Sequence, residues 1–167
     1  MKLSLQELID AFRDKVEKYL EGIDTSLHPY DIAEDLLEWR DEDEQLYLDE
    51  IFKLPQELQA LVMIELPRHC HEEIAKYFTP NKLASLLNTL DTDDAAELIR
   101  NIEDVDEEVA HKVLESLPHK DRENLQTLIA YDEYEAGAYM QTEIFYAFID
   151  EQVGDSIRRL KRLKAQK

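Results

Sequence analysis

The chain has 167 residues, the size of one ordinary domain with room for a small appendage, and 44% of them are hydrophobic, enough to build a core. Acidic residues outnumber basic ones by 39 to 19, and a net charge of −20 repels nucleic acid and anionic membrane surfaces, so we expect neither as a direct partner. The single cysteine, Cys70, cannot form an intramolecular disulfide, and no apolar run approaches the roughly 20 residues that cross a bilayer. We therefore expect a cytosolic polypeptide without an export signal and without direct membrane insertion.

The first predicted element is a helix. Apolar residues recur at intervals of three and four from Leu5 to Leu20, which is typical of an amphipathic helix. Gly22 can end this helix by adopting the left-handed conformation that other residues avoid. The whole chain has three glycines and five prolines, too few turn signals for a series of hairpins. The sequence therefore predicts an all-helical fold.

Proline marks the start of most helices that follow. A proline in the first turn of a helix costs no hydrogen bond, because the N–H at that position has no partner within the helix. Asp and Thr, which cap helix N-termini, open two further segments. The predicted helices begin at Leu27-His28-Pro29, Leu54-Pro55, Leu66-Pro67, Thr79-Pro80, Asp91-Thr92, Asp104-Val105-Asp106 and Leu117-Pro118.

The spacing of these starts is about a dozen residues, which leaves room for a helix of two to three turns and almost no loop. Helices this short are stable only when neighbours cover their apolar stripes. Stacked in order they bury one continuous seam, so the repeat predicts a superhelical α-solenoid of short stacked helices. An irregular helical bundle with coincidental proline spacing is the alternative. We assign residues 1–130 to this acidic superhelical domain.

The pattern changes after residue 130. Residues 131–140 have no helical stripe, and Glu143–Ile149 is an aromatic, β-branched run that predicts a short strand. A last helix is predicted over residues 153–163. We interpret residues 131–167 as a linker and the beginning of a second, truncated domain.

Charge is distributed unevenly along the chain. Residues 152–167 carry six basic side chains and one acidic side chain, Asp155, which gives +5 and leaves −25 on residues 1–151. Such a basic tail is either a cationic helix in its own right or the start of a domain whose remainder is missing.

No catalytic motif stands out. The sequence lacks a nucleophile elbow, a P-loop, paired zinc-ligand cysteines and an H-E-x-x-H helix, so we do not expect an enzyme. His69-Cys70-His71 has metal-ligating side chains, but residues two apart on a helix point to different sides. We interpret this triplet as a helix N-terminus with exposed histidines. Cys70 is expected to be buried as a small hydrophobe.

Carboxylates gather in clusters, mostly at predicted helix starts and turns. Acidic side chains there interact favourably with the helix macrodipole, by about 0.3–1 kcal/mol each, which requires no function. The cluster that begins at Asp91 is not an EF-hand loop, because Ala96 replaces the central glycine and Ile102 the acidic twelfth residue. Self-repulsion among so many charges nevertheless favours the binding of hard cations. The clusters are residues 41–44, 91–97, 103–108 and 132–135.

The helices lead into Ala130-Tyr131-Asp132-Glu133-Tyr134-Glu135-Ala136-Gly137-Ala138-Tyr139-Met140-Gln141-Thr142-Glu143. Proline-started acidic helices followed by this run resemble the N-terminal cytosolic region of the MgtE family of magnesium transporters. In that family a superhelical domain ends in a tyrosine, a short acidic stretch, Ala-Gly, and then Met-Thr and an acidic residue, ahead of the first strand and helix of a CBS domain. Here Gln141 separates Met140 from Thr142, and Ala138 replaces a usual glycine. The resemblance is strongest over residues 66–140.

The resemblance implies a regulatory domain. In the family, the acidic N and CBS domains repel one another when magnesium is scarce, and intracellular Mg²⁺ bridges their carboxylates and closes the pore. It therefore implies Mg²⁺ as a weak regulatory ligand and the CBS and transmembrane domains of the same protein as partners. It also implies a homodimer as the full-length transporter and a place at the cytoplasmic face of the cell membrane. Mg²⁺ is held by one or two carboxylates and keeps several waters, so such a site needs convergent acids and no cage.

The resemblance also implies metal ligands. Glu73 stands in the register of a family acidic residue at the interface between the N and CBS domains. A second acidic position falls at Asp106 and Glu107, and the register also allows Asp104. His111 stands where some family members have another acid.

Two functions follow from these observations. The first is a Mg²⁺-responsive gating domain of a magnesium transporter. The second is a soluble scaffold whose solenoid surface binds a protein, similar to flagellar motor switch proteins, without metal sensing. The scaffold is expected to bind a basic partner independently of divalent ions, which separates the two.

Overall fold

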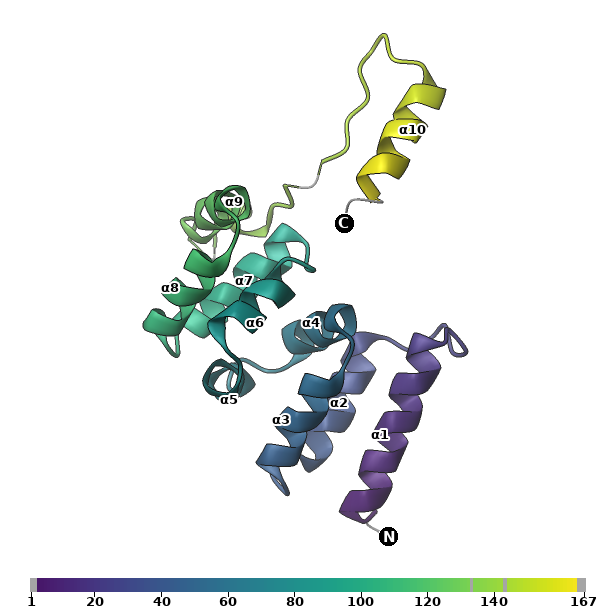
Figure 1. Ribbon diagram of the computed structural model, residues 1–167, viewed down its shortest axis with the longest axis vertical. Coiled ribbons are helices and arrows are strands. Elements are labelled where there is room, and N and C mark those ends of the chain that lie inside the picture. Colours follow the sequence, from purple (N-terminus) through teal and green to yellow (C-terminus); the bar gives the residue numbers. More distant parts are fainter. Residues whose placement is uncertain (1–2, 133, 143, 165–167) are drawn as a thin grey trace.

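The computed structural model describes residues 3–132, 134–142 and 144–164. Within these residues it contains ten α-helices, one 3-10 helix and no strand, so the all-helical prediction is confirmed. Figure 1 shows α1 to α9 stacked one after another, with α10 at the end of an extended arm. No helix among the described residues is both long and apolar enough to cross a membrane. The elements are α1 Leu5–Leu20, α2 Pro29–Trp39, α3 Glu44–Lys53, α4 Gln56–Glu65, α5 Cys70–Tyr77, α6 Pro80–Leu87, α7 Thr92–Glu103, α8 Glu107–Ser116, α9 His119–Ile129, η1 Ala136–Tyr139 and α10 Val153–Lys164.

The first helix has the ends that its sequence predicts. Ser4 and Glu7 form a capping box, in which the Ser4 N–H donates to the Glu7 carboxylate over 2.8 Å and the Ser4 hydroxyl accepts the Glu7 N–H. Just beyond the C-terminal end of α1, Gly22 has a φ of 65°, the left-handed conformation expected of it.

The prolines start helices in two ways. Pro29 and Pro80 are the first residues of α2 and α6, whereas Pro55 and Pro118 occupy the N-cap positions of α4 and α9. Pro67 precedes a tight turn, in which its carbonyl accepts the N–H of Cys70, the first residue of α5. None of these positions requires a backbone N–H donor within a helix, so proline fixes the chain direction without weakening the helix.

Helix α3 is absent from the sequence-based prediction. It begins in the acidic run at 41–44, where the side chain of Asp43 caps it by accepting the Leu46 N–H over 3.0 Å. On the inner face of α3, Tyr47 and Ile51 are fully buried. The acidic start of α3 is thus a helix cap, in line with the macrodipole interpretation of these clusters.

Alternate helices stack along the superhelix. α2 packs on α4, α4 on α6 and α6 on α8, while α7 contacts α4, α5, α8 and α9. Buried apolar side chains from Ile9 in α1 to Leu128 in α9 form one continuous cluster. This is the single seam expected of stacked helices that cannot fold singly.

Three aromatic rings fill the centre of the N-terminal half. Trp39, at the end of α2, lies edge-on to Phe12 and Tyr47, with ring centroids 6.1 and 6.4 Å apart. All three side chains are fully buried, and aromatic pairs at these distances and angles add to the stability from burial alone. Trp39 thereby fixes the position of the next residue, Arg40.

The segment after α9 folds back on itself, and it is attached to the body through η1, which packs against α9 and α7, and through Thr142. The ring of Tyr131 lies so close to Gly137 that a Cβ there would be 2.6 Å from a ring carbon, which accounts for the glycine. Farther on, the Thr142 N–H donates to the Thr92 hydroxyl over 3.0 Å at the first turn of α7. The chain therefore leaves the body from the N-terminal end of α7.

The strand predicted over Glu143–Ile149 is wrong for the residues that the structure describes. Residues 144–149 have no regular secondary structure, and residue 143 lies outside the described part. A strand is stabilised by pairing with another strand, and the described residues supply none. The last predicted helix is confirmed as α10. The interpretation of residues 131–167 as the start of a CBS domain stays a prediction.

Candidate functional site

The residues predicted to bind metal, Glu73 and the three at 104–107, lie on two of three segments that two ion pairs join, and the remaining segment contributes Arg40. The segments are the turn between α2 and α3, the N-terminal part of α5 with the turn before it, and the turn between α7 and α8. Arg40, in the first segment, forms an ion pair with Glu73 of α5. Arg68, just before α5, forms an ion pair with Asp104 of the third segment. We call residues 40–44, 68–73 and 104–107 the acidic edge.

Glu73 is held by a two-pronged contact. The Nε atom of Arg40 donates to Oε2 of Glu73 over 2.9 Å, and Nη2 donates to Oε1. The two side chains are 20% and 19% exposed. Paired charges shielded from water interact more strongly than exposed ones, and the fork of a guanidinium matches both oxygens of a carboxylate. The hydrogen bond to Glu73 also raises the pKa of Arg40 above its ordinary value, so Arg40 stays charged.

Arg40 has a second acidic neighbour. Its Nη1 atom donates to Oδ1 of Asp41 over 2.8 Å, and Asp41 is 91% exposed. The guanidinium therefore lies between two carboxylates that belong to different segments of the acidic edge.

The other predicted ligands are more open to solvent. Asp104 pairs with Arg68, and both side chains are more than half exposed. Asp106 caps α8 by accepting the Val109 N–H over 3.0 Å, and Glu107 is exposed in the first turn of that helix. The structure thus brings Asp104, Asp106 and Glu107 into one turn and places Glu73 on α5, linked to Arg40.

These residues do not form a closed metal cage. Among the residues that the structure describes, no group of three or more His, Cys, Asp or Glu side chains is arranged to hold a metal ion. Carboxylate oxygens are nevertheless the ligands that Mg²⁺ prefers, and it needs only one or two of them beside its waters. The acidic edge therefore offers carboxylate oxygens of the kind that Mg²⁺ prefers, but its described residues do not form a complete metal site by themselves.

The triplet His69-Cys70-His71 lies at the start of α5, but its histidines differ. His69 is exposed, as expected, whereas His71 is 1% exposed, so the prediction of exposed histidines is wrong for His71. The Nε2 atom of His71 lies 2.9 Å from the carbonyl oxygen of Met63, to which its neutral N–H can donate. Cys70 is fully buried, as predicted, and burial raises the pKa of its thiol, which makes it a poor nucleophile.

Sequence reasoning missed a cleft next to the acidic edge. Its volume is about 360 Å³, and α4, α7 and η1 contribute to its walls. Burial, and then repulsion from Asp93 and Asp91, raise the pKa of the Asp94 carboxyl on its α7 wall. The acidic cluster at 91–97 and Arg100 belong to one helix and are visible in the sequence, but Arg68 and the walls from α4 and η1 come from elsewhere in the chain. The lining residues are Ile64, Leu66, Arg68, Asp93, Asp94, Glu97, Arg100, Asn101, Ala138 and Tyr139.

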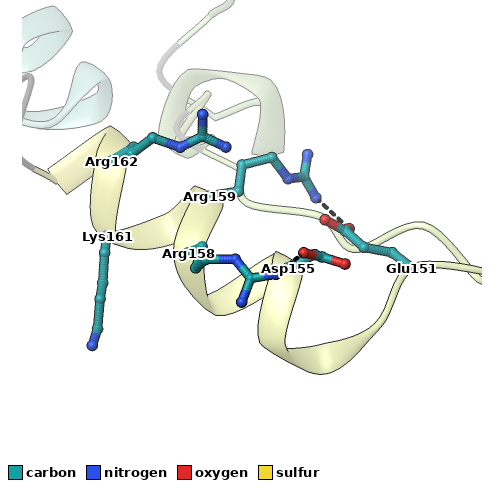
Figure 2. Close-up of a pocket in the computed structure, with 6 residues that line it drawn as sticks. All are labelled: Glu151, Asp155, Arg158, Arg159, Lys161 and Arg162. Carbon is teal, nitrogen blue, oxygen red and sulfur yellow. Dashed lines mark hydrogen bonds and ion pairs between the residues drawn. The ribbon is translucent and has the colours of Figure 1, made fainter.

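A second hollow, of about 480 Å³, lies on α10 (Figure 2). Four of its six charged side chains form ion pairs: Arg159 with Glu151 over 2.8 Å, and Arg158 with Asp155. The Arg159 guanidinium also stacks on the ring of Phe145 at 4.9 Å. The contacts of Arg159 bind α10 to the segment before it.

The comparisons with known proteins point to one family. The family model of the MgtE intracellular N domain matches residues 27–134. Among solved structures, the chain is similar to a crystal structure of the cytosolic domain of the Mg²⁺ channel MgtE in complex with ATP, with a TM-score of 0.72 and 24% sequence identity. That match covers 90% of this chain and 63% of the other, so the chain spans less than two thirds of that relative. At this identity the likeness establishes the fold alone. The curated proteins contain no match.

Proposed function

Because the chain belongs to the family of MgtE intracellular N domains, we propose that it is a regulatory domain of a magnesium transporter. It senses intracellular Mg²⁺ through the carboxylates of the acidic edge and gates a transmembrane pore that another part of the transporter forms. The role is regulatory and not catalytic, in keeping with a sequence that carries no catalytic motif.

The observation that carries this proposal is the acidic edge itself. Its three segments all carry carboxylates and are linked through Arg40 and Arg68, and the net charge of −20 adds a field that attracts divalent cations. Glu73, Asp104, Asp106 and Glu107 are the proposed ligands. Each contributes to a shared site, because Mg²⁺ keeps part of its water shell and takes the remaining oxygens from the facing domain.

The proposed partners follow from this arrangement. They are the CBS and transmembrane domains of the same transporter, which acts as a homodimer with this domain at the cytoplasmic face of the cell membrane. Two acidic surfaces repel each other until a divalent cation lies between them, so Mg²⁺ draws the domains together.

The test is Mg²⁺ influx into vesicles that contain the transporter bearing this domain, measured with a Mg²⁺-sensitive dye at rising internal Mg²⁺. The variant replaces the four proposed ligands by their amides, which keeps an N-cap side chain at residue 106. A matched control neutralises three carboxylates on α1 and one at its C-cap and thus changes the net charge equally. The test variant is Glu73→Gln, Asp104→Asn, Asp106→Asn and Glu107→Gln, and the control is Asp10→Asn, Asp14→Asn, Glu17→Gln and Glu21→Gln.

We expect influx to stop at high internal Mg²⁺ in the unmodified transporter and in the control, and to continue in the test variant. Equal inhibition of all three proteins contradicts the proposed role of the acidic edge. Divalent-independent binding of a basic protein to the solenoid, with no effect of the domain on influx, would establish the scaffold function instead.

A further inference from the structure

We infer that Arg40 is a built-in competitor of Mg²⁺ at Glu73, so that the divalent ion binds there only after displacing the guanidinium. This inference rests on the proposed function and names how the site is regulated. It concerns a residue that contributes no ligand of its own, because a guanidinium only donates hydrogen bonds.

The first step of the argument is the place that Arg40 occupies. Its guanidinium contacts both oxygens of Glu73 and one oxygen of Asp41. A Mg²⁺ ion that used Glu73 would approach the same carboxylate oxygens. Arg40 and the metal ion are therefore alternatives for one carboxylate.

The second step is that the pair is preformed. Arg40 follows the fully buried Trp39 at the C-terminal end of α2. Glu73 precedes the fully buried Ile74 in α5. Both backbones are thus fixed by the core, so forming the ion pair costs less conformational entropy than in a flexible segment.

The third step is the contrast with the other ion pair of the acidic edge. Arg68 and Asp104 are 60% and 54% exposed, whereas Arg40 and Glu73 are 20% and 19% exposed. Exposed pairs are screened by salt and contribute little, whereas shielded two-pronged pairs are stronger. Asp104 is therefore open to cations, and Glu73 is masked.

The fourth step concerns the displaced guanidinium. Arg40 already donates to Asp41, so it can keep one acidic partner when Glu73 turns to a metal ion. The exchange leaves no buried charge unpaired, which makes it reversible. Because Mg²⁺ must displace Arg40, half-saturation of Glu73 requires a higher Mg²⁺ concentration than half-saturation of an unpaired carboxylate.

The experiment is an NMR titration of the 167-residue chain with MgCl₂ at constant ionic strength, followed at the backbone amide of Glu73. Three variants are compared with the unmodified chain: Arg40→Gln, Arg40→Lys and the control Arg68→Gln. We expect Arg40→Gln to lower the Mg²⁺ concentration at half-shift about fivefold or more, the factor for one ion pair worth about 1 kcal/mol. Arg40→Lys, which keeps the charge but loses the fork, lowers it less. Arg68→Gln leaves the Glu73 midpoint unchanged.

The double variant Arg40→Gln, Glu73→Gln tests whether the ion binds at Glu73. We expect this variant to lose the lower Mg²⁺ midpoint that Arg40→Gln alone produces. The inference is overturned if the unmodified chain and both Arg40 variants have the same Mg²⁺ midpoint. It is also overturned if Arg68→Gln lowers the midpoint as much as Arg40→Gln does. If the NMR spectrum of Arg40→Gln lacks the dispersion of a folded chain, the comparison of Arg40→Lys with the unmodified chain decides whether the inference holds. Failure here is distinguishable from failure of the proposed function, because Mg²⁺ control of influx is measured separately and does not require Arg40 to compete.

Discussion

Burial of His71 predicts a loss of stability in mild acid. Its side chain is 1% exposed, and burial lowers its pKa below the ordinary 6.5; Arg68 and His69 add to this shift, while the Met63 carbonyl and Glu97 oppose it. The folded chain therefore binds fewer protons at this site than the unfolded chain. The contribution of His71 to stability is fully present above pH 6.5 and is lost as pH falls from 6.5 towards the folded pKa.

The size of this effect follows from proton linkage. If His71 stayed fully neutral in the folded chain, protonation of the unfolded chain would lower the free energy of unfolding by about 1.4 kcal/mol between about pH 7.5 and 5.5, which is the upper limit of the effect. The substitution His71→Gln removes the titrating group and keeps an N–H donor for the Met63 carbonyl. The two proteins should thus diverge in their pH dependence in this direction and by no more than this amount, whatever the difference in their stability at neutral pH.

The assay is urea unfolding followed by the fluorescence of Trp39, the only tryptophan and a fully buried one. Both proteins are unfolded at several pH values between the two limits, and the difference between their free energies is plotted against pH. Carboxylates that titrate elsewhere affect both proteins equally and cancel in this difference. A difference that stays constant with pH would refute the reasoning, because it would mean that His71 titrates alike in the folded and unfolded chains.

Two further substitutions test the packing and the first helix end. Trp39→Ala should lower the free energy of unfolding by about 3–5 kcal/mol, because it leaves a cavity between Phe12 and Tyr47. Unfolding of this variant is followed by circular dichroism, because the fluorescent side chain is gone. A loss below about 1 kcal/mol would contradict the central place of Trp39 in the core. Gly22→Ala should lower it by about 1–2 kcal/mol, because alanine is strained at a φ of 65°; an unchanged thermal midpoint would show that α1 ends without the left-handed residue.

The helices could be predicted from the sequence where their starts carry a local signal. Proline and the caps act through their own backbone and their nearest neighbours, so Pro29 and Pro80 mark helix starts without knowledge of the fold. Helix α3 lacks proline, and its Asp43 cap is one of four consecutive acids, which hides it. The run ending at Ile149 has strand-forming side chains, but strand formation depends on a neighbouring strand that local sequence does not reveal.

The candidate site was less accessible to sequence reasoning. The resemblance to a family gave the position of Glu73 but not its partner, because Arg40 lies 33 residues away in the chain. The burial of His71 escaped prediction for a related reason, since its acceptor is the Met63 carbonyl of the preceding helix. Long-range pairing of this kind depends on how the helices stack, and periodicity within one helix carries no record of it.

The attachment of the extended arm has a mechanical consequence. Thr142 is hydrogen-bonded to Thr92 at the first turn of α7, and Asp104 caps the opposite end of the same helix. A helix of 12 residues is a stiff rod about 18 Å long. Because α7 is also packed against α4, α5, α8 and α9, a pull on the arm at Thr142 is borne by the whole C-terminal half of the stack, which includes the turn that carries Asp104.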